Sequence, residues 1–154
     1  MDNGTKFFLF LHIGAAVLWV GGGITLHVIG RRALASGDRQ RMLQFSQDAD
    51  WIGPRFYAPL SIVLLLAGFK LVSDLNYDMS TTFVSIGLTG WLISFGIGIG
   101  YYSRAAKKRD EVVAAEGLDG PGFLASYKQV ANVNAIEISI LLFVVFAMSW
   151  KMGV

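Results

Sequence analysis

Long runs of apolar residues, separated by short polar segments, make up most of the chain. The runs are continuous instead of being spaced at the three- and four-residue intervals of an amphipathic helix, which is typical of membrane spans. A helix needs about 20 residues to cross about 30 Å of hydrocarbon, and four runs approach or exceed that length. The predicted spans are about Phe7–Gly30, Phe56–Val72, Thr81–Tyr102 and Val130–Trp150. We therefore expect an all-α, integral membrane four-helix bundle with a single transmembrane domain over residues 1–154.

Two of the polar segments between these spans carry helical patterns of their own. The stretch DRQRMLQFSQDADWIG predicts a short interfacial helix that ends at Gly53-Pro54. The stretch SRAAKKRDEVVAAEG predicts an extension of the third span as far as Gly117, before the turn LDGPG. We find no internal repeat and no second domain in the sequence.

The charges support a membrane location and indicate an orientation. Only 16% of the residues are charged, whereas a soluble domain carries about 25%. The basic residues gather in the two long segments between spans: Arg31, Arg32, Arg39, Arg41 and Arg55 in one, and Arg104, Lys107, Lys108, Arg109 and Lys128 in the other. The turn SDLNYDMSTT carries only acidic charges. The positive-inside rule then predicts two longer cytoplasmic loops and both termini outside.

The same distribution limits the partners. Because the basic residues follow the expected topology and do not form one patch, we expect the lipid bilayer as a partner and no nucleic acid. The net charge is only +2. The sequence has no cysteine, which excludes disulfides, thiolate metal sites and a cysteine nucleophile.

The first span, FLFLHIGAAVLWVGGGITLHVIGRR, places unusual residues along one face. At about 100° per residue, Trp19 and Gly30 return to the face of His12, and Gly23 lies about 20° from it. A histidine facing lipid is unfavourable, so we expect this seam to face the bundle interior. Glycines there allow close approach of another helix or of a flat ligand. His27 is about 22 Å further along the helix, too far to share a metal ion with His12.

The fourth span carries the other buried polar residues. Asn134 and Glu137 lie one turn apart on one side, and Met148 follows on that side. An intramembrane acid is a candidate for proton or cation handling. If the antiparallel first and fourth spans are adjacent, His27 lies near Asn134 and Glu137, and His12 is at the depth of Met148.

Each of these residues also has a purely structural interpretation. The histidines can hydrogen-bond a neighbouring helix, and Glu137 can be a protonated acid paired with Asn134 or His27. Met148 can serve only packing. The glycines of the third span indicate close helix contacts. They are Gly87, Gly90, Gly96, Gly98 and Gly100.

Short motifs in all four spans resemble a known group of proteins. In the first span the order is His12, Trp19 and Gly21-Gly22. The others are Pro59 and Gly68 in the second span, Gly90-Trp91 in the third, and AMSWK at Met148–Lys151. Nearly the whole chain resembles small four-helix bacterial integral membrane proteins. These are related to the copper resistance protein D superfamily and to HemJ-type, haem-dependent protoporphyrinogen oxidases.

The resemblance implies a haem b bound at His12 in the bacterial inner membrane. Trp19, Gly22 and Gly23 would line the pocket, and Met148 is a candidate for the opposite ligand. A quinone or a porphyrin-like molecule would be the substrate of such an oxidoreductase. The chain reads ITLHVIGRR where the oxidases have a YLPRLF-like segment, which argues against porphyrinogen oxidation itself.

Three functions therefore stay open, and the residues assign no catalytic group. The first is a membrane b-type haem protein that transfers electrons, with His12 as the metal ligand. The second is a haem-free proton- or cation-coupled carrier based on Glu137, Asn134 and His27; a homodimer would supply the symmetry common in transporters. Its copper variant uses the ligands His12, Met148 and Met152. The third is a non-catalytic accessory subunit of a membrane complex.

Overall fold

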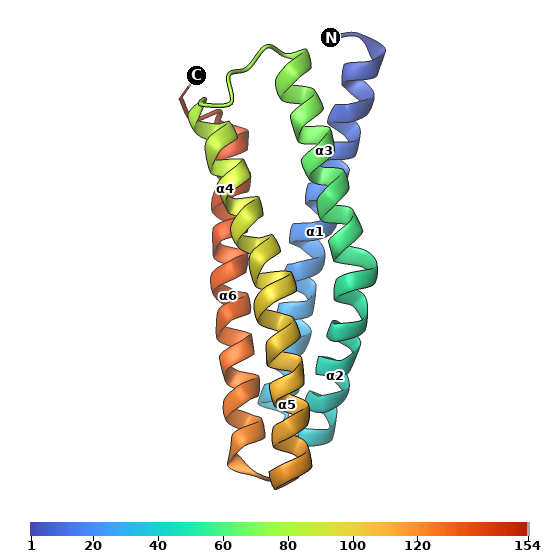
Figure 1. The fold of residues 1–154 in the computed structure, drawn as a ribbon, viewed down its shortest axis with the longest axis vertical. Helices are drawn as coiled ribbons and strands as arrows, with labels where there is room; N and C mark the ends of the chain where they lie inside the picture. Colours follow the sequence, from blue (N-terminus) through green and yellow to red (C-terminus); the bar gives the residue numbers. More distant parts are fainter. Residues whose placement is uncertain (154) are drawn as a thin grey trace.

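The computed structural model describes residues 1–153 as an all-α protein of four long helices packed side by side (Figure 1). The elements are α1 (Asn3–Ala35), α2 (Arg39–Ile52), η1 (Gly53–Tyr57), α3 (Ala58–Asp74), α4 (Thr82–Gly96), η2 (Ile97–Tyr102), α5 (Ser103–Glu116) and α6 (Pro121–Trp150). The N-terminus and the end of α6 lie at the end of the bundle that carries the α3–α4 connection (Figure 1). All four helices contain an apolar segment long enough to cross a membrane, which confirms the four-helix architecture and the four candidate spans.

The second long helix differs from the sequence prediction. The helix that begins at Arg39 does not end at Gly53-Pro54, because the π-helical segment η1 joins α2 directly to α3. The Ala58 N–H donates to the Gly53 carbonyl, five residues earlier, across the proline. A proline removes one backbone donor, and a widened turn accommodates this loss without a break in the helix. The predicted helix over this stretch is confirmed as α2, but the prediction that it ends at Gly53-Pro54, separate from the second span, was wrong.

The third long helix agrees with the sequence prediction beyond its apolar segment. The π-helical segment η2 joins α4 to α5, and α5 continues to Glu116. Gly117 then adopts a φ of +73°, in the left-handed region that glycine enters without strain. The extension of this helix as far as Gly117 is thus confirmed.

Glycines position the helices against one another at some of the predicted places. A Cβ at Gly87 would collide with Met148, and a Cβ at Gly90 would collide with Val144, so α4 and α6 pack closely there. The other three glycines of this helix, Gly96, Gly98 and Gly100, have no atom within 4 Å of the Cβ position. The prediction of close contacts at those three was wrong, because Gly96 precedes η2, Gly98 and Gly100 lie within it, and all three face open space.

The bundle has an apolar surface along its candidate spans and a compact core at one end. Large apolar side chains such as Phe10, Leu66 and Ile136 are exposed along the apolar segments, as suits contact with lipid. At the α2–α5 end, a core of buried residues instead joins α1, α2 and α6. Its members are Ala33, Met42, Phe123 and Tyr127.

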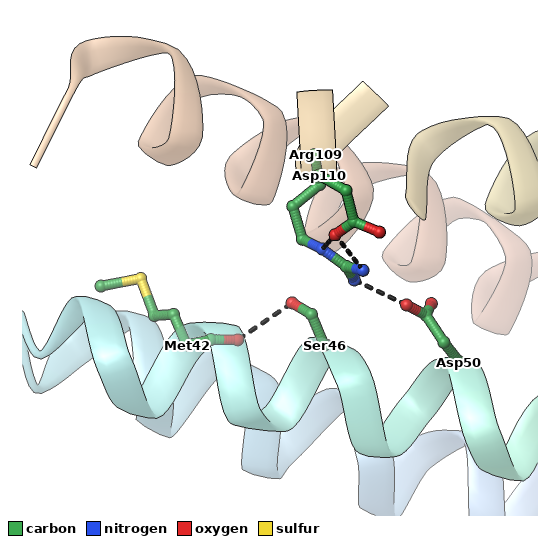
Figure 2. Close-up of polar contacts among 5 residues, drawn as sticks. All are labelled: Met42, Ser46, Asp50, Arg109 and Asp110. Atoms are coloured by element: carbon green, nitrogen blue, oxygen red, sulfur yellow. Dashed lines mark hydrogen bonds and ion pairs between the residues drawn. The ribbon is translucent and has the colours of Figure 1, made fainter. Parts of the chain in front are cut away.

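An ion pair next to this core connects α2 to α5 (Figure 2). Arg109 is only 8% exposed, and its Nη1 donates to Asp50 Oδ2 at 2.6 Å. Its Nε and Nη2 both donate to Asp110 Oδ1, at 2.9 and 2.7 Å. On α2, Ser46 Oγ donates to the Met42 carbonyl at 2.9 Å (Figure 2). Two carboxylates thus compensate one buried guanidinium, a charge-assisted arrangement that fixes α5 beside α2.

Candidate functional site

Four polar side chains form a hydrogen-bonded chain across three helical segments, and we call them the polar chain. His27 comes from α1, Tyr102 from the end of η2, and both Asn134 and Glu137 from α6. His27 Nδ1 lies 2.9 Å from Asn134 Oδ1. Asn134 Nδ2 donates to Tyr102 Oη at 3.3 Å, and Tyr102 Oη donates to Glu137 Oε2 at 2.6 Å. The polar chain therefore ends at one carboxyl group, that of Glu137.

The hydrogen bonds of the polar chain all run in the same direction. Asn134 Oδ1 can only accept, so His27 carries its proton on Nδ1 and donates it. The Asn134 amide then donates to Tyr102, which donates to Glu137. Bonds aligned in this way polarise one another in a medium of low dielectric constant. The result is a set of donors that stabilises negative charge on Glu137.

Local helix geometry explains why these residues meet. Asn134 and Glu137 are three residues apart on α6 and so share a face. Tyr102 follows Ser94 by eight residues, which in a regular α-helix would place the two about 80° apart. The wide turn of η2 absorbs an extra residue and reduces this angle to about 20°. The π-helical segment thus turns Tyr102 toward the side of the helix that Ser94 occupies.

Glu137 lies in an enclosed and polar environment within the apolar part of the bundle. It is 8% exposed, and it lies about 10 Å along α6 from the predicted span boundary at Val130. Ser94 on α4 is close to the same carboxyl group and is 1% exposed. Its Oγ lies outside hydrogen-bond geometry and has no other partner in residues 1–153. A buried hydroxyl without a partner is rare, and here it faces an ionisable group.

The sequence-predicted seam on α1 faces the interior only in part, because Gly30 packs against α2 and α6 whereas the Cβ position of Gly23 is open. Trp19 and Gly30 are buried, whereas His12 and Gly23 are half-buried. His12 Nδ1 lies 3.0 Å from the Leu64 carbonyl of α3. The imidazole also covers Gly68 of α3, where a Cβ would be 3.1 Å from His12 Cε1. His12 thus anchors α1 to α3 and stands apart from the polar chain.

The surroundings of His12 meet only part of what a haem site requires. A bond from Nδ1–H to a carbonyl would leave Nε2 free as a ligand, as is usual for metal-binding histidines. The predicted room for a flat macrocycle is filled at Gly22 by the Tyr57 side chain and at Gly68 by the imidazole, whereas the Cβ position of Gly23 is open. The residues do not fit a haem held between His12 and Met148.

Met148 is not directed toward the helix that His12 contacts. It packs on Gly87 of α4, whereas the His12 imidazole lies against α3. Met152 lies in the turn after α6, where its carbonyl accepts the Phe83 N–H at 3.0 Å. Within residues 1–153, no group of three or more histidines and carboxylates is arranged to hold a metal ion.

Tyr102 and Ser94 belong to the site but were not identified from the sequence. Tyr102 was assigned as the last residue of a span, where aromatic residues commonly mark the interface. The only sequence signal for Ser94 was a polar residue inside an apolar run. The turn of η2 that aligns them leaves no recognisable motif, because IGIGYY is as apolar as the helix around it.

Relationships to other proteins do not identify the site. Comparison of the chain with protein-family models, with curated proteins and with solved structures gave no match in any of the three. The interpretation of function therefore depends on the polar chain and on His12.

Proposed function

We propose that the protein is a proton-coupled carrier of the bacterial inner membrane, in which Glu137 binds and releases the proton. The observation that carries the proposal is a chain of hydrogen bonds that links α1, α6 and η2 and ends, through Tyr102, at one buried carboxyl group. An ionisable residue inside an apolar bundle is costly, and its usual explanation is a role in moving ions or protons. The donors of the polar chain offset that cost when Glu137 is ionised.

The proposed orientation places the polar chain near the cytoplasm. The basic residues lie in and around α2 and α5, so by the positive-inside rule these helices are cytoplasmic and both termini are outside. His27 is nearer the α2 end of α1. Asn134 and Glu137 lie 4 and 7 residues from the predicted span boundary at Val130, whereas Glu137 is 13 residues from the boundary at Trp150. Protons would therefore reach Glu137 from the cytoplasmic side by the shorter route.

Proton binding would alter the contact between η2 and α6. The 2.6 Å bond from Tyr102 to ionised Glu137 is charge-assisted, and protonation makes it an ordinary neutral bond of about half the strength. Tyr102 is the last residue of η2, and π-helical turns often mark segments that change conformation in function. Protonation of one carboxyl group would thus loosen the segment that joins α4 to α5.

A proton suits the site better than a metal ion. The polar chain offers one carboxylate and otherwise neutral groups, whereas divalent cations are held by several oxygen ligands, usually more than one of them charged. A copper variant has less support, because Met148 and His12 contact different helices.

Infrared spectroscopy tests whether Glu137 exchanges a proton. The purified protein should show a carboxylic acid C=O band that appears and disappears with pH and is lost in Glu137→Gln. Glu111→Gln, which removes an exposed carboxylate on α5, is the matched control and should retain the band. A band unchanged in Glu137→Gln would refute the assignment.

Transport in reconstituted vesicles tests the carrier function itself. Vesicles with a trapped pH indicator and an imposed membrane potential should take up protons with the wild-type protein, and Glu137→Gln should abolish the uptake. A titrating band without proton uptake would make Glu137 a structural acid. That result would favour the accessory-subunit alternative over the carrier.

A b-type haem protein with His12 as ligand is the second candidate. The resemblance described above implies it, and the His12–Leu64 contact, which would leave Nε2 free, favours it. Absorption spectra of the oxidised and dithionite-reduced protein decide between the two candidates. Haem bands that disappear in His12→Ala and persist in Glu137→Gln would support a redox role with a quinone or porphyrin-like substrate. A colourless protein, expressed with ample haem, would exclude it.

A further inference from the structure

Helices α5 and α6 lie side by side (Figure 1), and a basic groove lies between the end of η2, the first part of α5 and the facing part of α6. Its volume is about 130 Å³. The lining residues are Tyr101, Arg104, Ala105, Lys108, Ser126, Gln129 and Val130. They include two cations and no carboxylate. None of them belongs to the polar chain or to the surroundings of His12.

The two cations of the groove are the ones that α5 leaves without partners. Arg109 is paired with Asp50 and Asp110, and Lys107 is 4.0 Å from Glu111. Arg104 and Lys108 form no ion pair with any of residues 1–153 and are both exposed. Because they are four residues apart, they project from the same face of α5. The groove thus concentrates uncompensated positive charge.

The remaining lining residues add neutral donors and an apolar floor. The Tyr101 hydroxyl and the Gln129 amide can both donate to an anion. The Ser126 hydroxyl is already used, because it donates to the Phe123 carbonyl at 2.8 Å. Ala105 and Val130 supply the apolar part of the lining. This combination suits a ligand with a phosphate group next to hydrocarbon.

The position of the groove relative to the membrane indicates which molecule supplies that phosphate. Tyr101 and Val130 lie at the predicted boundaries of the third and fourth spans, where lipid headgroups meet the protein. We propose that the groove binds the headgroup of an anionic phospholipid of the cytoplasmic leaflet, with Arg104 and Lys108 on its phosphate. Basic pockets between membrane helices on the cytoplasmic side are suited to such headgroups. The leaflet follows from the proposed orientation, whereas the site itself is independent of proton transport.

Native mass spectrometry of the full-length protein in a neutral detergent tests the proposal. The probes are phosphatidylglycerol and phosphatidylcholine with identical acyl chains. We expect the wild-type protein to retain phosphatidylglycerol about 30-fold better, and the preference to vanish in Arg104→Gln/Lys108→Gln. The control Arg31→Gln/Lys107→Gln removes two charges from the same end of the bundle, outside the groove, and should keep the preference.

A variant that fills the groove and a competition with inorganic phosphate test the proposal further. Gln129→Trp fills the groove from α6 without changing the charge and should also abolish retention. Equal losses in the two double variants would show that general surface charge binds the lipid, and retention by Gln129→Trp would place the lipid elsewhere. Displacement of phosphatidylglycerol by millimolar inorganic phosphate would identify a free-phosphate site and overturn the lipid assignment.

Discussion

Tyr102 is the residue on which the polar chain depends, because it accepts a hydrogen bond from Asn134 and donates one to Glu137. Tyr102→Phe keeps the ring and removes both bonds. We expect the free energy of unfolding to fall by about 1–2 kcal/mol, since buried polar groups on α6 lose their partner. Unfolding in sodium dodecyl sulfate, followed by tryptophan fluorescence, measures the loss.

Tyr101→Phe is the control for this variant. The two tyrosines are neighbours, but Tyr101 lies at the groove between α5 and α6 and has no hydrogen bond in the described part of the chain. We expect Tyr101→Phe to change the stability little. Equal losses of stability in Tyr101→Phe and Tyr102→Phe would mean that the effect of Tyr102→Phe does not come from the hydrogen bonds of the polar chain.

Residue-level prediction succeeded where helical spacing alone determines the contacts. A spacing of three residues, close to one helical turn, places Asn134 with Glu137, and the antiparallel order of α1 and α6 places His27 beside Asn134, where the structure has it. His12 was expected at the depth of Met148 if the first and fourth spans are adjacent. Its imidazole instead contacts α3, because rotation of a helix about its axis depends on all its neighbours. The spacing of residues along one span does not determine which neighbouring helix each residue contacts.

At the scale of elements, α4 and α6 are held together by close contact at glycines. A methyl group at Gly90 would collide with Val144, whereas the Cβ position of Gly98 is open. We expect Gly90→Ala to lower the free energy of unfolding by about 1–3 kcal/mol through overpacking, and Gly98→Ala to have little effect. The same detergent unfolding assay compares them. If both variants were neutral, the contact between the two helices would have to be more adaptable than the packing indicates.

The widened turn of η2 leads to a test by deletion. A π-helical turn holds one residue more than an α-helical turn, so deletion of Gly98 leaves a regular helix with both ends in register. We expect the free energy of unfolding of this variant to lie within about 1 kcal/mol of the wild-type value. Deletion of Leu92 in α4 instead rotates the preceding part of the helix by about 100° and should prevent folding. Size-exclusion chromatography and the unfolding assay measure both, and similar damage from the two deletions would contradict this view of η2.

The ion pair of Arg109 makes a smaller, testable contribution to the link between α2 and α5. Asp50→Asn preserves the shape of the side chain but weakens the 2.6 Å contact to Nη1. We expect a loss of about 1 kcal/mol, because Asp50 is partly exposed and Asp110 still pairs with the guanidinium. Asp48→Asn on the same helix is the control, and it has no ion pair with the residues described. A loss as large in Asp48→Asn would trace the effect to net charge.

Two predicted helix ends, at Gly117 and at Gly53-Pro54, show which helix boundaries sequence patterns can predict. Gly117 ends α5 as predicted, because its left-handed φ is a local property that glycine provides. Gly53-Pro54 did not end the helix, because the carbonyl of Gly53 finds a donor five residues later. Whether a proline breaks a helix or widens it depends on the packing of both flanking segments. That packing is settled only in the assembled bundle.

At the scale of the whole molecule, the orientation in the membrane decides from which side Glu137 is reached. The basic residues predict that the α5–α6 turn is cytoplasmic and that the α3–α4 connection is outside. The natural sequence has no cysteine, so a single introduced thiol reports its own location. Met79 and Asp119 are exposed positions at the opposite ends of the bundle.

We expect a membrane-impermeant maleimide to label Met79→Cys in intact cells, and to label Asp119→Cys only after permeabilisation. The physical reason is that a loop rich in arginine and lysine is retained on the cytoplasmic side during insertion, whereas the acidic turn crosses freely. The reverse labelling would place the polar chain near the outer surface. Protons would then reach His27 and Glu137 from outside, and the basic groove between α5 and α6 would face a different leaflet. The same pair of thiols therefore tests the direction of the proposed proton route and the leaflet of the proposed lipid site.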